Sequence, residues 1–181
     1  MSAVTQCDVP AGSLLAQYGG PADYRDCFYR DVSGVVNLPD FIERFYSSSA
    51  FLPERMILRV IAGPSTRADA RAFARGQTDR FGAWQLVERT DLSSSSGVEH
   101  GPRGQPVGRK NAEALFHSKD TGTASWFAVE PQEQATRLLF GSWVGGIGDS
   151  GWKSMLRAHV WYSRFLLDEI TAIVTRERAP T

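Results

Sequence analysis

The last part of the chain carries the pattern that most constrains the fold, a long run of apolar residues at helical spacing. From Trp152 to about Val174 the apolar positions fall in one stripe at about 100° per residue. This stripe consists of Trp152, Met155, Leu156, Val160, Leu166, Leu167, Ile170, Ile173 and Val174. A weaker stripe of Ala158, Trp161, Phe165 and Ala172 lies roughly opposite. We therefore expect a long C-terminal helix that is covered on both sides, by its own chain or by a partner.

The residues before this helix contain several strand-like stretches. The first is Tyr24 to Val32, and a second begins near Phe81, where the apolar period changes to two. Three more are expected at 112–117, 123–129 and 135–144, separated by short turns. Consecutive strands with short turns are typical of an antiparallel meander.

Helices are expected between the first two strands. Asn37 can cap a helix whose first turn holds Pro39 and Asp40. A second helix is expected from Pro53 to about residue 62, before Gly63 and Pro64. A third, short helix is expected after Thr66, because Thr66 and Asp69 resemble a capping box and Gly76 suits the C-terminal end.

The order of these elements predicts an α+β fold. An antiparallel β-meander would wrap on the long C-terminal helix, with a helical insertion after the first strand. The chain of 181 residues suits one domain, which we place at 23–176. Residues 1–22 are expected to be an irregular N-terminal segment, and 177–181 a tail. The polar run 91–111 is expected to be a long, mobile loop.

Composition excludes several classes of protein. Twenty basic residues balance twenty acidic ones, which argues against a dedicated nucleic-acid binder. No stretch approaches the roughly 20 apolar residues of a membrane-spanning helix, and no secretory signal is visible. Cys7 and Cys27 are too few for a disulfide framework, so we expect free thiols and a cytoplasmic protein.

Two glycine-containing motifs near the C-terminal helix match known signatures only superficially. Residues 146–151 fit the pattern G-x-G-x-x-G, but the chain after them is too short to close the parallel unit that a dinucleotide site requires. A turn between strand and helix, with or without a bound anion, explains them better. The tetrad 148–151 looks like a serine-protease nucleophile, yet the chain lacks the size for that fold. We expect no cofactor.

The strongest candidates for chemistry lie on the C-terminal helix. His159 and Ser163 sit near the centre of its apolar stripe, one turn apart. Such a histidine is either a hydrogen-bonded core residue or an acid–base group in a cavity. Neither His100 nor His117 has metal-ligand spacing with His159, so no metal site is expected.

Other charged residues have simpler interpretations. Residues 51 to 80 contain six arginines and three acidic residues. Arg67, Arg71 and Arg75 recur every four residues and form a stripe on the expected helix. This stripe could meet an anion, but a solvated helix face is the simpler interpretation. Among strand carboxylates, Glu88, Glu113 and Glu130 could each face a cavity, with surface placement as the default.

The order of elements resembles the helix-grip fold of the START-like superfamily, also called SRPBCC or Bet v 1-like. Two stretches are similar to uncharacterised bacterial members. In one, the Val129-Glu130-Pro131 turn precedes the Thr136-Arg137-Leu138 strand, and the other is His159-x-x-Tyr162-Ser163-Arg164. The resemblance covers roughly residues 23–176, and the helical segment 37–76 and the 91–111 loop depart from a typical member. It implies a cavity between sheet and long helix that suits an apolar or amphipathic molecule, and it carries over no catalytic motif.

Three functional hypotheses follow. The first is binding of a hydrophobic or amphipathic small molecule by an apolar pocket. Its expected lining residues are Trp84, Trp126, Phe140, Trp152, Met155 and His159. The second is an enzyme that uses the same cavity, similar to a cyclase or dehydratase, with His159 and Ser163 as catalytic residues. The third is an interaction or assembly role through the second apolar helix face, for example as a homodimer.

Overall fold

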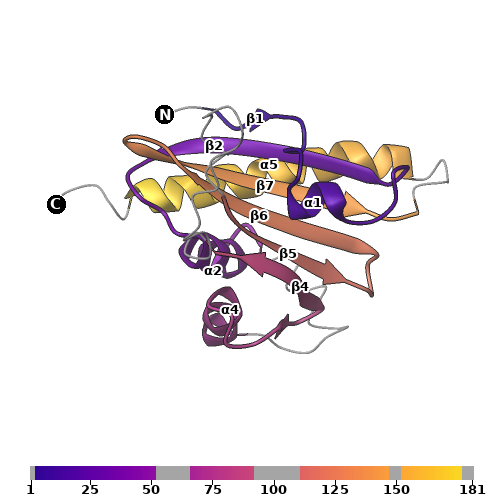
Figure 1. The fold of residues 1–181 in the computed structure, drawn as a ribbon, viewed down its shortest axis with the longest axis horizontal. Coiled ribbons are helices and arrows are strands. Elements are labelled where there is room, and N and C mark those ends of the chain that lie inside the picture. Colours follow the sequence, from indigo (N-terminus) through magenta and orange to yellow (C-terminus); the bar gives the residue numbers. More distant parts are fainter. Residues whose placement is uncertain (1–2, 52–65, 92–110, 147–151, 177–181) are drawn as a thin grey trace, which may run out of the picture.

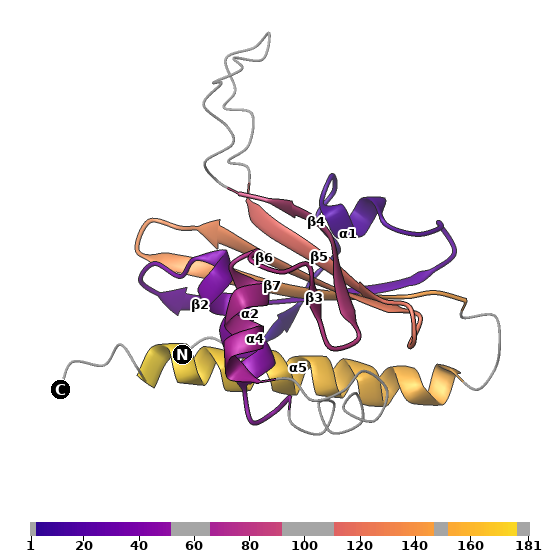
Figure 2. The same ribbon diagram turned by 90° about the horizontal axis from the view of Figure 1, so that it is seen from below.

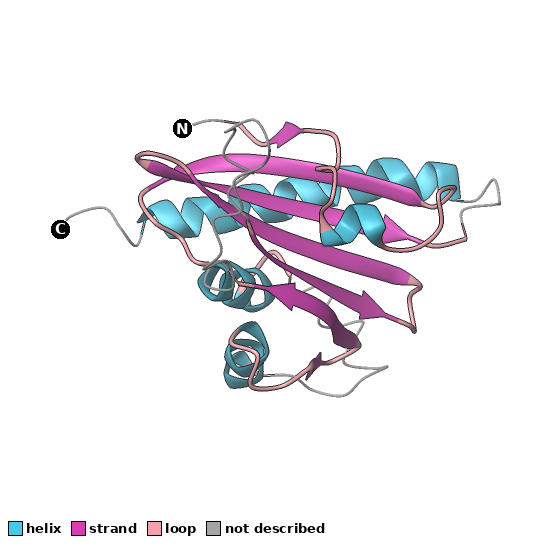
Figure 3. Cartoon of the chain, viewed as in Figure 1, coloured by secondary structure: helices cyan, strands magenta, loops and turns pink. Residues whose placement is uncertain are grey.

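An antiparallel sheet with helices on both faces forms the molecule (Figures 1 and 3). The computed structural model describes residues 3–51, 66–91, 111–146 and 152–176. The strands are β1 (Thr5–Gln6), β2 (Tyr24–Ser33), β3 (Arg80–Phe81), β4 (Trp84–Thr90), β5 (Ala112–Ser118), β6 (Thr123–Pro131) and β7 (Ala135–Val144). The helices are α1 (Leu14–Gln17), α2 (Leu38–Ser47), α4 (Arg67–Ala74) and α5 (Trp152–Arg176). Together these elements confirm the predicted α+β class.

The strand order places the first long strand of the chain beside its last strand. Among the described residues the sheet has seven strands in the order β1-β2-β7-β6-β5-β4-β3, and all neighbours are antiparallel. Strands β4 to β7 form the predicted meander. Strand β2 pairs along its whole length with β7, from Tyr24 opposite Val144 to Ser33 opposite Ala135. The first long strand and the last strand are therefore neighbours beneath α5.

The helices after β2 begin at the predicted caps. The Asn37 side chain accepts a hydrogen bond from the Asp40 backbone N–H at 2.8 Å, and Thr66 and Asp69 form a complete capping box. Gly76 follows α4 with a φ of +68°, a conformation that glycine adopts without steric cost. The helix predicted from Pro53 lies outside the described residues.

Helix α5 covers one face of the sheet together with α2 and α4, and α1 lies on the other face (Figure 2). Leu166, Leu167 and Ile170 of α5 are fully buried in the main core. The ring of Phe45 in α2 packs edge-on against Phe127 at 4.7 Å between centroids, a favoured aromatic arrangement. Of the predicted main stripe, Leu166, Leu167 and Ile170 therefore form core, whereas Leu156 and Val160 are only partly buried. The side chains of residues 152–155 and 173–176 lie outside that description.

The N-terminal segment is more ordered than predicted. Residues 1–22 were expected to be irregular, but β1 pairs with β2, and the side chain of Ser13 caps α1. Leu15 of α1 is buried in a second apolar cluster on the outer face of the sheet. That cluster consists of Leu15, Cys27, Leu115, Ala124, Trp126, Ala128 and Leu139. Both faces of the central strands are apolar, so the short N-terminal elements supply a necessary cover.

The second stripe of α5 stays exposed. The Trp161 side chain is 66% exposed and Phe165 is 43% exposed, and their rings stack at 5.6 Å. Of the two expected covers, the protein's own chain or a partner, the described chain leaves Trp161 and Phe165 exposed, and cover by a partner, such as a second copy, stays a prediction. The predicted loop at 91–111 and the tail at 177–181 fall almost entirely outside the described residues. No helix in the described part is long and apolar enough to span a membrane.

Candidate functional site

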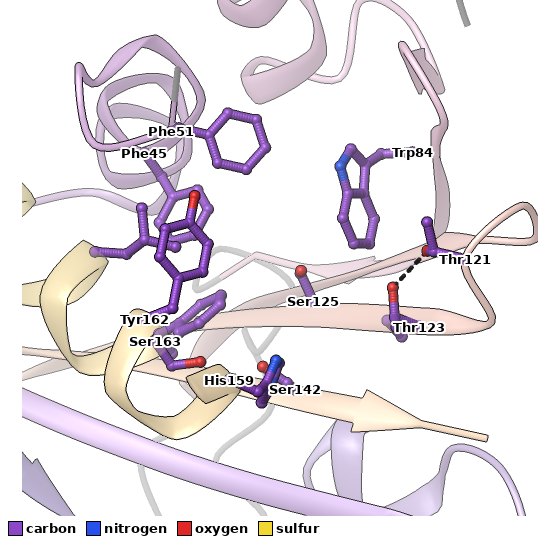
Figure 4. Close-up of a pocket in the computed structure, with 13 residues that line it drawn as sticks. Phe45, Phe51, Trp84, Thr121, Thr123, Ser125, Ser142, His159, Tyr162 and Ser163 are labelled. Atoms are coloured by element: carbon purple, nitrogen blue, oxygen red, sulfur yellow. Dashed lines mark hydrogen bonds between the residues drawn. The ribbon is translucent and has the colours of Figure 1, made fainter. Parts of the chain in front are cut away.

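A cavity of about 320 Å³ lies between α5, α2 and the sheet (Figure 4). Its walls combine aromatic rings from several elements with a set of small hydroxyl side chains. The lining residues are Phe45, Phe51, Trp84, Thr121, Thr123, Ala124, Ser125, Phe140, Ser142, His159, Tyr162, Ser163 and Leu166. The volume lies at the lower end of the range for small-molecule sites, roughly 300–1,000 Å³.

Four of the predicted site residues line this cavity. Trp84 enters from β4, Phe140 from β7, and His159 and Ser163 from α5. These positions belong to elements that are far apart in sequence and meet only because α5 packs over β2 and β7. The close-up shows Phe51 and Trp84 on one side of the space and His159 with Ser142 on the other (Figure 4).

Trp126, by contrast, does not line the cavity. Successive strand residues point to opposite faces, and Phe127 of β6 occupies the cavity side of the sheet. Trp126 lies in the outer cluster, where its indole N–H donates to Glu113 at 2.6 Å. The structure therefore does not bring Trp126 to the cavity, because its position in the strand register turns it to the outer face. The side chains of Trp152 and Met155 lie outside the described residues.

A row of polar residues crosses the cavity side of the sheet. Asp26 of β2 stands directly opposite Ser142 of β7, and Ser142 stands opposite Ser125 of β6. The row ends at Phe116 of β5, which is opposite Ser125 and belongs to the aromatic core. The hydroxyl groups of Ser142 and Ser125 thus continue from the Asp26 carboxylate into the floor of the cavity.

His159 lies at the start of this row, against Asp26. The His159 Nε2 atom is 3.5 Å from Oδ2 of Asp26. The carboxylate also accepts hydrogen bonds from the Tyr24 hydroxyl and from the Ser142 backbone N–H, each at 3.1 Å. Burial raises the pKa of Asp26, and the neighbouring His159, Tyr24 and Ser142 offset part of that rise. Because these partners hold the Asp26 carboxylate in place, it determines which edge of the His159 imidazole ring turns toward β2.

The sequence held a signal for Asp26 that went unused. Positions 24, 26, 28, 30 and 32 share one face of β2, and Phe28 and Val32 mark that face as core. A charged residue on an apolar face is informative, because buried charges need partners. Asp26 and Arg30 both occupy it, and both find partners on α5.

Two lining residues carry a buried nitrogen without a hydrogen-bond partner in the described structure. These atoms are Nε1 of Trp84 and Nε2 of His159. Most buried polar atoms in proteins are paired, with protein or with a bound molecule. Nε2 of His159 faces the Asp26 carboxylate, so Nε1 of Trp84 is the atom of the two that a bound molecule or water would complete.

The other candidates for chemistry lie away from the cavity. Glu113 accepts from Trp126 and from the Leu14 backbone on the outer face, and Glu130 accepts from Asn111 at 2.8 Å. Glu43 pairs with Arg71 at 2.9 Å and with Arg75 at 3.8 Å, in a groove between α2 and α4.

Metal ligands and cysteines add no further site. No group of three or more His, Cys, Asp or Glu side chains suited to a metal occurs in the described part. Both cysteines are free thiols, and burial raises the pKa of the Cys7 thiol and of the Cys27 thiol. Of the glycine motif at 146–151, only Gly146 is among the described residues.

Comparisons of the chain with protein-family models and with curated proteins find no match. The functional conclusion therefore rests on the cavity, on the residues that line it, and on the contact between His159 and Asp26.

Proposed function

We propose that this protein binds an apolar or amphipathic small molecule in the cavity between the sheet and α5. The observation that carries the proposal is the lining itself, which combines aromatic rings with a few hydroxyl groups and one imidazole. Sites for small molecules have this composition, mostly apolar with few polar groups that fix orientation. We also propose membership of the START-like superfamily, which the antiparallel sheet and the C-terminal helix packed on it support.

A neutral fluorescent probe tests the binding proposal. N-phenyl-1-naphthylamine gains fluorescence in apolar surroundings, so we expect a saturable signal with one site per chain. The variant Ser163→Leu places a larger side chain at a buried lining position and should weaken binding at least tenfold. Ala158→Leu adds similar bulk at an exposed position of the same helix and should leave binding unchanged. A signal that does not saturate, or that Ser163→Leu leaves intact, contradicts the proposal.

A second candidate function is acid–base catalysis in the same cavity, and the contact of His159 with Asp26 favours it. A carboxylate that orients an imidazole is a common arrangement for proton transfer. If the cavity works in this way, the protein should accelerate the exchange of the C1 hydrogens of 2-tetralone in D2O. His159→Gln should lose this acceleration, whereas His117→Gln, on the outer face, should keep it. Equal rates with and without the protein contradict this candidate.

A further inference from the structure

The polar atoms of the cavity differ in what they offer to a ligand. The hydroxyl groups of Ser125, Ser142 and Ser163 both donate and accept hydrogen bonds. His159 is the one imidazole among the described lining residues, and a neutral imidazole offers one donor and one acceptor. Which hydrogen bond His159 makes depends on which of its two ring nitrogens carries the proton.

The Asp26 carboxylate decides the tautomer of neutral His159. Nε2 is fully buried and faces Oδ2 of Asp26. An unprotonated Nε2 would turn its lone pair toward a carboxylate oxygen, which is electrostatically unfavourable. The proton therefore sits on Nε2, and Nδ1 carries the lone pair. The side chain is 26% exposed although Nε2 is buried, so the accessible surface belongs to the other atoms of the side chain.

The charge of the lining restricts the ligand further. No lysine, arginine, aspartate or glutamate occurs among the described lining residues. A carboxylate ligand would meet no positive charge except a protonated His159, whose ring already faces the negative Asp26. Burial of a charge without a partner is costly, so an anionic head group fits this cavity poorly.

The body of the ligand is set by the aromatic lining. Phe45, Phe51, Phe140 and Tyr162 present rings from α2, from the segment after it, from β7 and from α5. Flat rings pack against such a lining by stacking or by edge-to-face contact. A flat, ring-containing molecule therefore matches the apolar part of the cavity.

We infer that the ligand is a neutral, hydroxyl-bearing aromatic compound whose hydroxyl group donates a hydrogen bond to Nδ1 of His159. The inference rests on the proposed binding function and names the chemical class of its ligand. The same hydroxyl oxygen is free to accept from a serine of the polar row. Selectivity for a neutral hydroxyl over a carboxylate is the property that distinguishes this class.

Three bicyclic probes with one ring system test the inference. Naphthalene has no head group, 2-naphthol has a neutral hydroxyl, and 2-naphthoate has a carboxylate at neutral pH. By isothermal titration calorimetry we expect 2-naphthol to bind about tenfold more tightly than naphthalene, the gain of one well-placed hydrogen bond. We expect 2-naphthoate to bind more weakly than 2-naphthol.

Two variants test whether the pair of His159 and Asp26 causes this selectivity. His159→Leu removes the acceptor, so 2-naphthol should bind only as well as naphthalene, and His117→Leu is the matched control on the outer face. Asp26→Asn lets an amide N–H face Nε2, which moves the imidazole proton to Nδ1. The Asp26→Asn variant should therefore bind 2-naphthoate better relative to 2-naphthol than the natural protein does.

The outcomes separate the two proposals. If none of the three probes binds, the binding function itself is wrong. If naphthalene binds but 2-naphthol binds no more tightly, or if 2-naphthoate binds most tightly, the binding function stands and the hydroxyl inference is overturned. The Asp26→Asn variant keeps the test decisive if His159→Leu fails to fold.

Discussion

Asp26 is a carboxylate in an apolar layer, and its cost to stability depends on its protonation. It is almost completely buried between β2 and α5, with His159, Tyr24 and Ser142 as its polar neighbours. Burial disfavours the charged form and raises the pKa of Asp26 in the folded protein. A residue kept at such a cost is a good candidate for function.

The raised pKa of Asp26 predicts a pH dependence of stability. Between the ordinary carboxyl pKa and the raised folded value, the folded state binds more protons than the unfolded state, so this group makes stability fall as pH rises. Asp26→Asn cannot ionise and should lack this fall. Thermal unfolding from pH 4 to pH 7 should show the variant gaining stability relative to the natural protein.

Asp31→Asn is a control on the same strand. It removes the ion pair in which Arg137 Nε donates to Asp31 Oδ1 at 2.8 Å. The stability that Asp31→Asn loses should not be recovered as pH rises from 4 to 7. A variant Asp26→Asn with the same pH profile as the natural protein would argue against a raised pKa at this site.

Helix α5 is attached to β2 through polar as well as apolar contacts. Arg30 of β2 is nearly buried, with 9% of its side chain exposed, and it donates to Oδ1 of Asp168 and to Oγ1 of Thr171, the latter at 2.8 Å. With the pair of Asp26 and His159, this gives β2 two polar links to the helix. These links hold α5 at the distance from the sheet at which the cavity forms.

The Arg30 contact predicts an effect of an exposed residue. Asp168 is 65% exposed, yet Asp168→Ala leaves the nearly buried Arg30 without its carboxylate partner. We expect a loss of about 1 kcal/mol in the free energy of unfolding, because a partly buried charge loses its compensation. Glu169→Ala is the neighbouring control, whose carboxylate is 3.5 Å from the Ser49 hydroxyl, and should cost less than about 0.5 kcal/mol. Denaturant unfolding that gives equal values for the two variants contradicts this role of Asp168.

The whole molecule is a sheet with two apolar faces, each of which needs a cover. Helices α2, α4 and α5 cover the face with the cavity, and the N-terminal elements cover the other. Gly141 of β7 allows α1 to pack closely on the outer face of the sheet, because a Cβ atom there would lie 2.5 Å from Cδ2 of Leu15. The N-terminal elements are therefore part of the domain that carries the cavity.

Leu15 provides a test of this cover. Leu15→Ala should reduce the free energy of unfolding by about 2–4 kcal/mol, as for other buried leucines. The same variant should keep its affinity for N-phenyl-1-naphthylamine, because Leu15 lies on the face opposite the cavity. A loss below about 1 kcal/mol would mean that the segment is an accessory and not a structural cover.

The sequence predicted most of the fold because periodicity and caps are local signals. Residues close together in the chain specify the capping box of Thr66 and Asp69, the strand at 135–144 and the long final helix. The N-terminal elements were missed because β1 and α1 are short and owe their stability to the sheet beneath them. Of the residues expected at the cavity, His159 and Ser163 on the apolar stripe line it, whereas Trp126 does not, because its face depends on a strand register that no local pattern supplies.

The sequence by itself determined the longer strands and helices, their order, and the presence of polar groups on the main apolar stripe of α5. Only the tertiary structure decided which strand faces His159. Strand β2 reaches α5 through its pairing with β7, a contact between residues more than a hundred positions apart. The partner of the histidine, Asp26, was therefore set by long-range strand pairing, and the physical reason is that register and packing, unlike helical periodicity, depend on residues that are distant in the chain.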